Sequence, residues 1–452
     1  MSTPSSEEPS APDAVGAGLR SRWQASRGGQ WIARHEFVRH VLTLLTGTAF
    51  AQVIGLAIYP IVTRLYSAAD MGVFNLFMAF VGFIVTIAAL RYDLAVVPAA
   101  TDDEARSLLS LATRCNLAVS LVTTVIMAVF AGPIAGSVGS PALAPWLWLV
   151  GPMVFVSAQV AVMGFWLNRK KYYSVTSSNQ MLQSLTMAGT RVGLGLPGSQ
   201  VFGLVASQFL GLFVALVRVV VKTRGELTGP RVTTRREVAA RHKRMPLVNG
   251  PNALVDAIRL NGITLLIGRF FSNDVVGNFS VAWLLIQAPL SLINGALSQV
   301  FFQKMAVTPR GQMLRLVRGS LVRSLLLGIV PFGLILFLAP PLLPWVLGND
   351  YHLVGVIAAA LVPWLYFNLA TSPVSMLFIV VQKQGIMLAF GITYMVVPLT
   401  ILWFFHTDIV DTMRVVSFAM GGLLMIFCLL ALWAAREFDA GRTPDLSLGG
   451  TK

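Results

Sequence analysis

Long, unbroken runs of apolar residues recur from Val41 to Ala434, and they constrain this chain more than any other feature. A run of about 20 apolar residues matches the thickness of the hydrocarbon core of a bilayer. Of the 452 residues, 56% are hydrophobic and 12% are charged. A soluble chain of this length needs more polar residues to cover its surface. The runs therefore predict a polytopic membrane protein rather than a large soluble helical protein.

We expect an all-α fold of about twelve transmembrane helices, because the runs lack the alternation of β-barrel strands and a helix satisfies its own backbone in lipid. The breaks between runs are charged or rich in Gly and Pro. The predicted spans are 41–62, 71–90, 108–131, 145–167, 174–196, 201–221, 248–270, 276–301, 321–346, 353–381, 386–405 and 413–434.

These spans divide the chain into two lobes of six helices. We expect a disordered cytoplasmic tail over residues 1–35, which are rich in Ser, Pro, Ala and Gly. The predicted N-lobe covers 36–221 and the predicted C-lobe 248–435. A basic cytoplasmic linker over 222–247 and a cytoplasmic tail over 436–452 complete the division.

The charged residues predict the orientation in the membrane. Basic residues gather in alternate loops, and the loop from Lys222 to Arg244 holds eight of them. The opposite loops carry acidic residues instead: Asp70, Asp274, Asp350, Asp408 and Asp411. By the positive-inside rule, both termini are predicted to be cytoplasmic. This distribution explains most of the net charge of +15, so the expected partners of the basic residues are anionic membrane lipids rather than nucleic acid.

The residues that carry catalysis in membrane enzymes are sparse here. Cys115 and Cys428 lie in different apolar runs and indicate small buried thiols rather than a disulfide or a metal site. There is no Gly-rich phosphate loop, and the histidines follow no metal-ligand spacing (His35, His40, His242, His352 and His406). We therefore expect no metal, no cofactor and no enzymatic activity. A membrane-embedded polysaccharide-biosynthesis enzyme remains the less favoured alternative.

An internal repeat relates the two halves. Residues 64–74 and 269–279 match across a shift of 205 residues, and both read Arg-x-aromatic-Ser-x-x-x-x-Gly-x-Phe. Each stretch joins the first and second helices of a six-helix set. Because six is even, both halves begin on the same side and can be parallel repeats. Chance similarity is the alternative, but the agreement with the helix count favours two lobes that enclose a cavity, as in many transporters, over a non-transporting scaffold.

The span 248–270 carries charges at hydrocarbon depth. An Arg, Lys or Asp at a helix centre costs about 2.5–3.5 kcal/mol on insertion scales, so it needs a partner or a watery cavity. At about 100° per residue, Asn249, Asn252, Asp256 and Arg259 share an arc of roughly 80°. We expect this stripe to line a cavity, with Arg259 binding an anionic group and Asp256 either holding Arg259 or carrying a coupling ion. The alternative is a pair that only stabilises helix packing.

Four further residues are weaker candidates. Arg191 either lines the cavity or reaches toward the interface. Gln52 shares a helix face with Thr48 and Tyr59, which predicts a cavity wall or a helix contact. Arg64 and Arg269 occupy equivalent positions of the repeat at the outer ends of their helices, which predicts a gate or cavity rim, with interfacial anchoring as the alternative.

Four groups of residues together resemble a known family. The first is Thr46-Gly47 leading to Pro60–Ser67 and Gly72-Val73-Phe74, and the second is Leu90–Val97. The third is Gly277-Asn278-Phe279, Ala288-Pro289-Leu290 and Gln299–Phe302, and the fourth is Ser372–Ser375 with Lys383-Gln384. From about residue 40 to 435 the chain resembles the O-antigen and polysaccharide flippase group (lipopolysaccharide biosynthesis proteins) of the multidrug/oligosaccharidyl-lipid/polysaccharide exporter superfamily.

The resemblance implies a bacterial inner-membrane flippase for surface polysaccharide, O-antigen or exopolysaccharide biosynthesis. Its expected substrate is an undecaprenyl-diphosphate-linked oligosaccharide, moved to the periplasmic leaflet by alternating access, and polysaccharide polymerase or export machinery are further expected partners. The resemblance also implies a cavity role for Arg259 and Arg191. A multidrug-type exporter of the same superfamily is the nearest alternative.

Overall fold

The structure is a computed structural model that describes residues 36–229, 234–243, 245–381 and 383–442, and these residues form helices joined by short turns. The first half contains α3 (Glu36–Ala57), α4 (Tyr59–Leu65), α5 (Ala68–Ala88), η1 (Tyr92–Ala95), α6 (Asp102–Val129), α7 (Ala131–Ser137), η2 (Pro141–Leu149), α8 (Val150–Arg169), α9 (Tyr173–Gly195) and α10 (Gln200–Leu227). A short helix, α11 (Arg235–Arg241), joins the halves.

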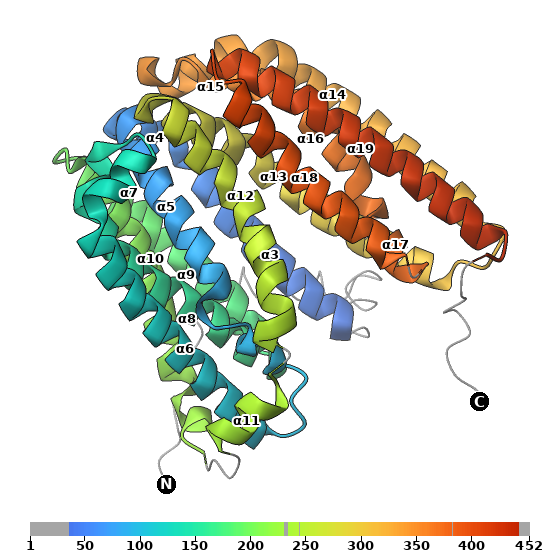
Figure 1. The fold of residues 1–452 in the computed structure, drawn as a ribbon, viewed down its shortest axis with the longest axis horizontal. Helices are drawn as coiled ribbons and strands as arrows, with labels where there is room; N and C mark the ends of the chain where they lie inside the picture. The colour runs from blue at the N-terminus through green and yellow to red at the C-terminus, as the bar shows by residue number, and fades with distance from the viewer. Residues whose placement is uncertain (1–35, 230–233, 244, 382, 443–452) are drawn as a thin grey trace, which may run out of the picture.

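The second half begins with the short element η3 (Met245–Asn249) and contains α12 (Gly250–Phe270), α13 (Asn273–Val307), α14 (Met313–Leu347), η4 (Asn349–Tyr351), α15 (Val354–Ala360), α16 (Val362–Thr371), η5 (Ser372–Val374), α17 (Leu377–Val380), α18 (Gln384–Phe404) and α19 (Ile409–Asp439). Figure 1 shows the two halves as two groups of helices. They converge at the end that carries α4 and α15 and diverge toward the end that carries α11 and α17.

The predicted two-lobed, all-helical membrane fold is confirmed. Nine helical segments of the described chain are long and apolar enough to cross a membrane, and a tenth forms if the pair Asn349–Ala360 and Val362–Val374, bent by 49°, counts as one span. Two further long helices, α9 and α12, lie at the predicted spans 174–196 and 248–270 but are not in this apolar set. Both carry many polar residues, which explains why they fall outside the apolar set.

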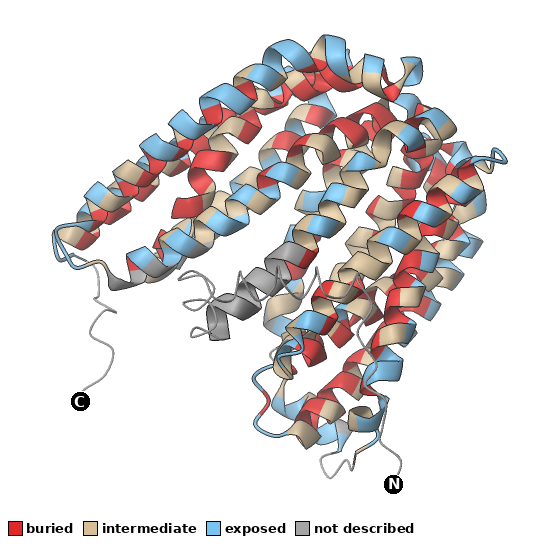
Figure 2. Ribbon diagram, turned by 180° about the vertical axis from the view of Figure 1, so that it is seen from behind, coloured by how far each residue is buried: buried red, intermediate tan, exposed pale blue. Residues whose placement is uncertain are grey.

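The outer surface of the lobes is apolar. On α14 the side chains of Leu326, Val330, Phe337 and Trp345 are exposed although they are large and hydrophobic. Figure 2 shows that buried residues gather on the inward sides of the helices, while exposed residues follow the outward sides. An apolar exterior of this kind suits contact with lipid tails rather than water.

The internal repeat produces the same local structure twice. Ser67 is the N-cap of α5 with φ −67° and ψ 161°, and Ser272 is the N-cap of α13 with φ −73° and ψ 163°. The Ser67 hydroxyl also accepts a hydrogen bond from the backbone N–H of Asp70. The repeated sequence therefore starts the second helix of each lobe in the same way.

The two glycines of the repeat bring α5 and α13 together. A Cβ atom added at Gly72 would overlap the carbonyl oxygen of Asn273, and one added at Gly277 would overlap that of Ala68. Ala68 and Asn273 are themselves 205 residues apart (273 − 68), which is the shift of the repeat. The contact is thus reciprocal, and each lobe supplies one glycine and one helix start.

Other contacts close the same end of the molecule. The Tyr351 hydroxyl donates to the backbone carbonyl of Tyr66 at 2.8 Å, which joins the C-lobe to the N-lobe. Gly139, at φ +67°, lies against the backbone of Gly268 so closely that a side chain would not fit. The lobes therefore pack backbone against backbone at the converging end.

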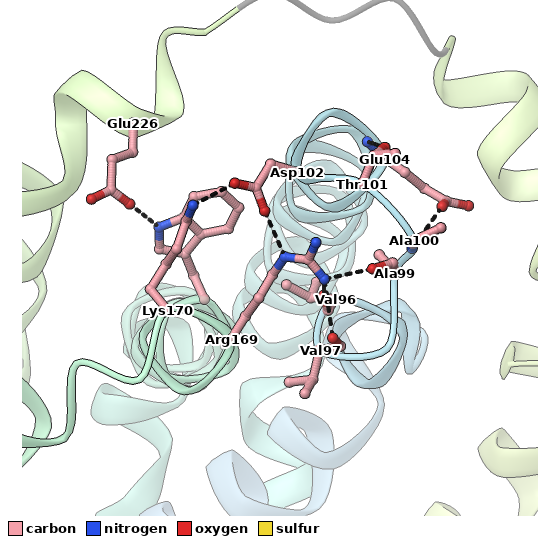
Figure 3. A network of polar contacts seen from close by, with 11 residues as sticks. Val96, Val97, Ala99, Ala100, Thr101, Asp102, Glu104, Arg169, Lys170 and Glu226 are labelled. Atoms are coloured by element: carbon pink, nitrogen blue, oxygen red, sulfur yellow. Dashed lines mark hydrogen bonds and ion pairs between the residues drawn. The ribbon is translucent and has the colours of Figure 1, made fainter.

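A polar network fixes the turn between α5 and α6 at the opposite end of the N-lobe. Figure 3 shows Arg169 donating to the backbone carbonyls of Val97 and Ala99 and to the carboxylate of Asp102. Lys170 pairs with the same carboxylate. Arg169 and Lys170 therefore fix the backbone of this turn.

We expect the reciprocal crossing to be sensitive to side-chain size. Gly72→Val or Gly277→Val forces α5 and α13 apart, and overpacking of this kind typically costs about 1–3 kcal/mol. Each variant should lower the thermal midpoint of the purified protein in detergent by several degrees. Gly164→Val and Gly422→Val are matched controls, because nothing lies within 4 Å of a Cβ added at either glycine. Equal thermal midpoints for all four variants would contradict the close contact of α5 with α13 at these glycines.

Candidate functional site

Two adjoining cavities lie inside the C-lobe. The smaller has a volume of about 200 Å³ and lies among α12, α13, α16 and α18, while the larger, of about 550 Å³, extends along α18 to α19. Arg259, Asn368 and Tyr394 line both cavities. These three residues come from three helices and separate the two cavities, which therefore lie side by side in this lobe.

Helix α12 positions the charged residues of this region. It starts with Gly250 and Pro251, and proline suits the first turn because no helical partner is needed there. It packs against α5 of the N-lobe and α18 of the C-lobe, so it lies between the two lobes in Figure 1. Its small residues Ala253 and Ala257 are fully buried. Asp256 and Arg259 line the cavities instead.

Asp256 and Arg259 form an ion pair within α12. The Arg259 guanidinium donates to the Asp256 carboxylate at 3.2 Å, and the side chains are 54% (Asp256) and 38% (Arg259) exposed. Arg259 lines both cavities, and Asp256 lines the larger one. Neither charge is enclosed in a dry helix contact. The pair therefore has room to bind a further anionic group.

Asn249 of the predicted stripe is not among the residues that line the two cavities. Asn249 is half-buried at the start of α12, and its amide nitrogen contacts the sulfur of Met245 at 3.3 Å. The side chain of Asn252 lies outside the described residues. Of the four stripe residues, Asp256 and Arg259 are therefore the two that the structure places at the cavity walls.

Arg191 lies inside the N-lobe, with 5% of its surface exposed. Its Nε donates to the Ser207 hydroxyl at 3.2 Å, and its guanidinium lies 5.4 Å from the centre of the Phe74 ring. Tyr66 donates to its backbone carbonyl at 2.7 Å. Arg191 is thus remote from Arg259, and the structure brings these two predicted arginines to different lobes.

Gln52 connects the lobes. Its amide nitrogen donates to the Ser291 hydroxyl of α13 at 3.5 Å, and its Oε1 is buried without a hydrogen-bond partner in the described part of the chain.

Arg64 and Arg269 are both exposed, and each lies in the last turn of its helix at the converging end. Their equivalent positions follow from the repeat.

A polar ladder on α13 is absent from the sequence-based predictions. Asn294 donates to Asn368 at 3.0 Å, and Ser298 donates to the backbone carbonyl of Ser372 at 3.0 Å. With Gln287 and Ser291 these α13 residues are spaced by four, three and four positions, which places them on one helical face. That spacing is the signal in the sequence that identifies them.

The described residues contain no group of three or more His, Cys, Asp or Glu side chains able to hold a metal ion. The cavity walls instead combine one ion pair with amides, hydroxyls and aromatic rings. This set of side chains is able to bind a polar or anionic ligand without metal ligation.

Comparison with protein families matches residues 61–354 to a family described as polysaccharide biosynthesis protein. Comparison with curated proteins gave no match. Among solved structures, the chain is similar to the lipid II flippase MurJ in an inward closed conformation, with 14% identity and a TM-score of 0.69 over 88% of this chain and 90% of that one.

A second similar structure is an inward-facing multidrug resistance MATE family transporter of the MOP superfamily. It has 14% identity and a TM-score of 0.52 over 88% of this chain and 94% of that one. At these identities the likeness shows a shared fold. Both neighbours are transporters rather than enzymes.

The exposure of the ion pair leads to a test of whether the cavity is wet. In a water-filled cavity the pair contributes less than about 1 kcal/mol, so Asp256→Asn should leave the thermal midpoint nearly unchanged. In a dry helix contact, losing one partner costs about 3–5 kcal/mol. Glu104→Gln is the positive control, because Glu104 is 7% exposed and pairs with Arg241 and His242. If Asp256→Asn lowered the thermal midpoint as much as Glu104→Gln does, the Asp256–Arg259 pair would be in a dry helix contact.

Proposed function

Since the chain belongs to the polysaccharide biosynthesis protein family, we propose that it flips a lipid-linked oligosaccharide from the cytoplasmic to the periplasmic leaflet of a bacterial inner membrane. The proposed cargo is an undecaprenyl-diphosphate-linked saccharide for surface polysaccharide, and the proposed mechanism is transport without catalysis. One observation carries the proposal: a partly exposed arginine, Arg259, lines two cavities inside a transporter fold.

Arg259 has the chemistry to bind a diphosphate. A guanidinium keeps its charge in the membrane and presents a flat fork of donors that matches phosphate oxygens. Asp256 holds it at 3.2 Å and fixes its position along α12. In this role Arg259 replaces the water that the diphosphate loses when it leaves the membrane surface.

Asp256 has a second role in the proposal, which is to couple transport to an ion gradient. A diphosphate at Arg259 brings negative charge close to the Asp256 carboxylate, and like charges disfavour each other at short distance. The bound cargo and Asp256 therefore compete for Arg259. For an inward ion gradient to drive outward transport, the coupling ion crosses inward on Asp256 during the steps in which the protein returns without cargo.

The arrangement of the lobes supports alternating access. The lobes converge at the end that carries α4 and α15 and diverge toward the end with the basic linker, which is predicted to be cytoplasmic (Figure 1). In the proposal this is the inward-open state, with both termini in the cytoplasm. Separation of the α5–α13 crossing, where the lobes meet, then opens the periplasmic side.

A multidrug-type exporter is the second candidate, and the likeness to the MATE transporter favours it. The two functions differ in the charge of the cargo, because a cationic drug requires a free carboxylate and an anionic diphosphate requires a free guanidinium. In the structure Asp256 and Arg259 neutralise each other. Transport assays with cationic dyes and with polyprenyl-diphosphate sugars separate the candidates directly.

Arg259→Ala should abolish surface-polysaccharide export while the protein still inserts into the membrane. Loss of one partner of a bound charge pair typically costs 2–5 kcal/mol, so flipping in proteoliposomes should fall about a hundredfold. Arg414→Ala is the matched control, because Arg414 pairs with Asp411 in the same spacing but at an exposed helix start. Normal export by a stably expressed Arg259→Ala variant would remove Arg259 from the site.

Asp256→Asn should make flipping independent of the pH gradient, because asparagine cannot take up a proton. The measurement is the initial rate of flipping in proteoliposomes with and without an imposed gradient. Asp411→Asn serves as the control and should keep the wild-type dependence. If Asp256→Asn also keeps it, the role of Asp256 is limited to holding Arg259.

A further inference from the structure

The smaller cavity has a composition that the larger one lacks. It is lined by Arg259 of α12, Trp283 and Gln287 of α13, Trp364 and Asn368 of α16, and Tyr394 of α18. The larger cavity also has aromatic lining, from Phe390 and Phe427, but among the described residues no tryptophan and no glutamine lines it, and its remaining apolar lining is aliphatic. The difference indicates that the two cavities receive different parts of one ligand.

Aromatic rings form a connected wall of the smaller cavity. The ring centres of Trp283 and Trp364 are 5.0 Å apart, Phe279 stacks on Trp283 at 6.1 Å, and Tyr394 meets Trp364 edge-on at 6.2 Å. Trp364 donates its indole N–H to the Tyr394 hydroxyl. Trp364 is only 4% exposed, so it supports the half-buried Trp283, which supplies the ring surface that faces the cavity.

An aromatic face is negative at its centre and attracts weakly positive hydrogens. A pyranose ring presents such hydrogens on one flat side, where several C–H groups point in the same direction, and carries hydroxyl groups around its edge. A wall of indole rings with amide groups beside it therefore complements a sugar better than it complements a plain hydrocarbon chain.

Gln287, an amide of this cavity, is incompletely paired. Its Oε1 atom is buried and has no hydrogen-bond partner among the described residues. An unpaired buried acceptor is unfavourable. A hydroxyl group of a ligand in the cavity is a donor that satisfies Gln287.

Arg259 determines which sugar of a saccharide fits. The same guanidinium lines both cavities. A diphosphate bound there places the sugar that is bonded directly to it within reach of the smaller cavity. A sugar farther along the chain is separated from the phosphate by at least one more ring.

We propose that the smaller cavity is the recognition site for the sugar attached to the diphosphate, with Trp283 against its ring, Trp364 supporting Trp283 from behind, and Gln287 accepting from a hydroxyl. The proposal rests on the proposed flippase function and adds a specificity site to it. It assigns cargo selection to the first sugar and leaves the remainder of the saccharide outside this cavity.

The test compares two probes with the full-length protein in nanodiscs. One probe is a short-chain polyprenyl diphosphate, and the other is the same lipid carrying a single N-acetylhexosamine. We expect the wild type to bind the sugar-bearing probe about tenfold more tightly than the bare one. Trp283→Leu and Gln287→Leu should each remove this preference and leave the affinity for the bare probe unchanged. Arg259→Gln should weaken binding of both probes equally.

Two controls keep the result specific. Trp345→Leu changes a tryptophan that is 79% exposed on α14 and should retain the wild-type preference. Trp283→Phe retains an aromatic face and should keep most of the preference for the sugar-bearing probe. If Trp283→Leu does not fold, Gln287→Leu tests the sugar site in its place.

The failures of the two proposals differ. If the wild type binds both probes in nanodiscs with equal affinity and flips both in proteoliposomes, the sugar site is wrong and the flippase function stands. The sugar site is also wrong if Trp283→Leu weakens binding of both probes in parallel. If the wild type neither binds the probes in nanodiscs nor flips them in proteoliposomes, the flippase function itself is wrong.

Discussion

Hydrocarbon cannot hydrogen-bond to a backbone or solvate a charge, and the arrangement of this molecule depends on that constraint. Long helices satisfy their own backbone, so the described spans need few polar partners. Where the chain turns, partners are supplied, as when Arg169 binds the carbonyls that follow η1. The same constraint makes the pair Asp256–Arg259 informative, because charges at that depth require the cavities beside them.

Much of the fold was predictable because apolar run length and the repeat are read directly from sequence. The ends of the helices were less predictable from the sequence. Helices α13 and α14 extend past the predicted spans 276–301 and 321–346. A helix continues beyond the hydrocarbon core for as long as its backbone groups form helical hydrogen bonds. Two predicted spans contain breaks, one before Pro60 and one near Pro363 and Pro373, where proline removes a backbone donor. Sequence alone does not show whether such a proline bends a helix or interrupts it.

The site was predictable in part, for a physical reason. Asp256 and Arg259 stand out because charge is costly in an apolar run, whereas Gln287 and Asn294 do not, because small amides are common in membrane helices. A polar helix face also does not identify its neighbour. The cavities beside Arg259 depend on α16 and α18, more than 100 residues away in sequence (362 − 259 = 103). The surroundings of Arg191 likewise come from α5 and α10.

The reciprocal contact between Gly72 and Gly277 also defines the symmetry that relates the two halves of the chain. In a two-fold symmetric dimer, residue i of one subunit meets residue j of the other, and j of the first meets i of the second. Gly72 with Asn273 and Gly277 with Ala68 follow this rule after the shift of 205 residues. The architecture is therefore that of a two-fold symmetric pair of six-helix units joined in one chain. Each unit carries both halves of this interface within the first turns of one helix, α5 or α13.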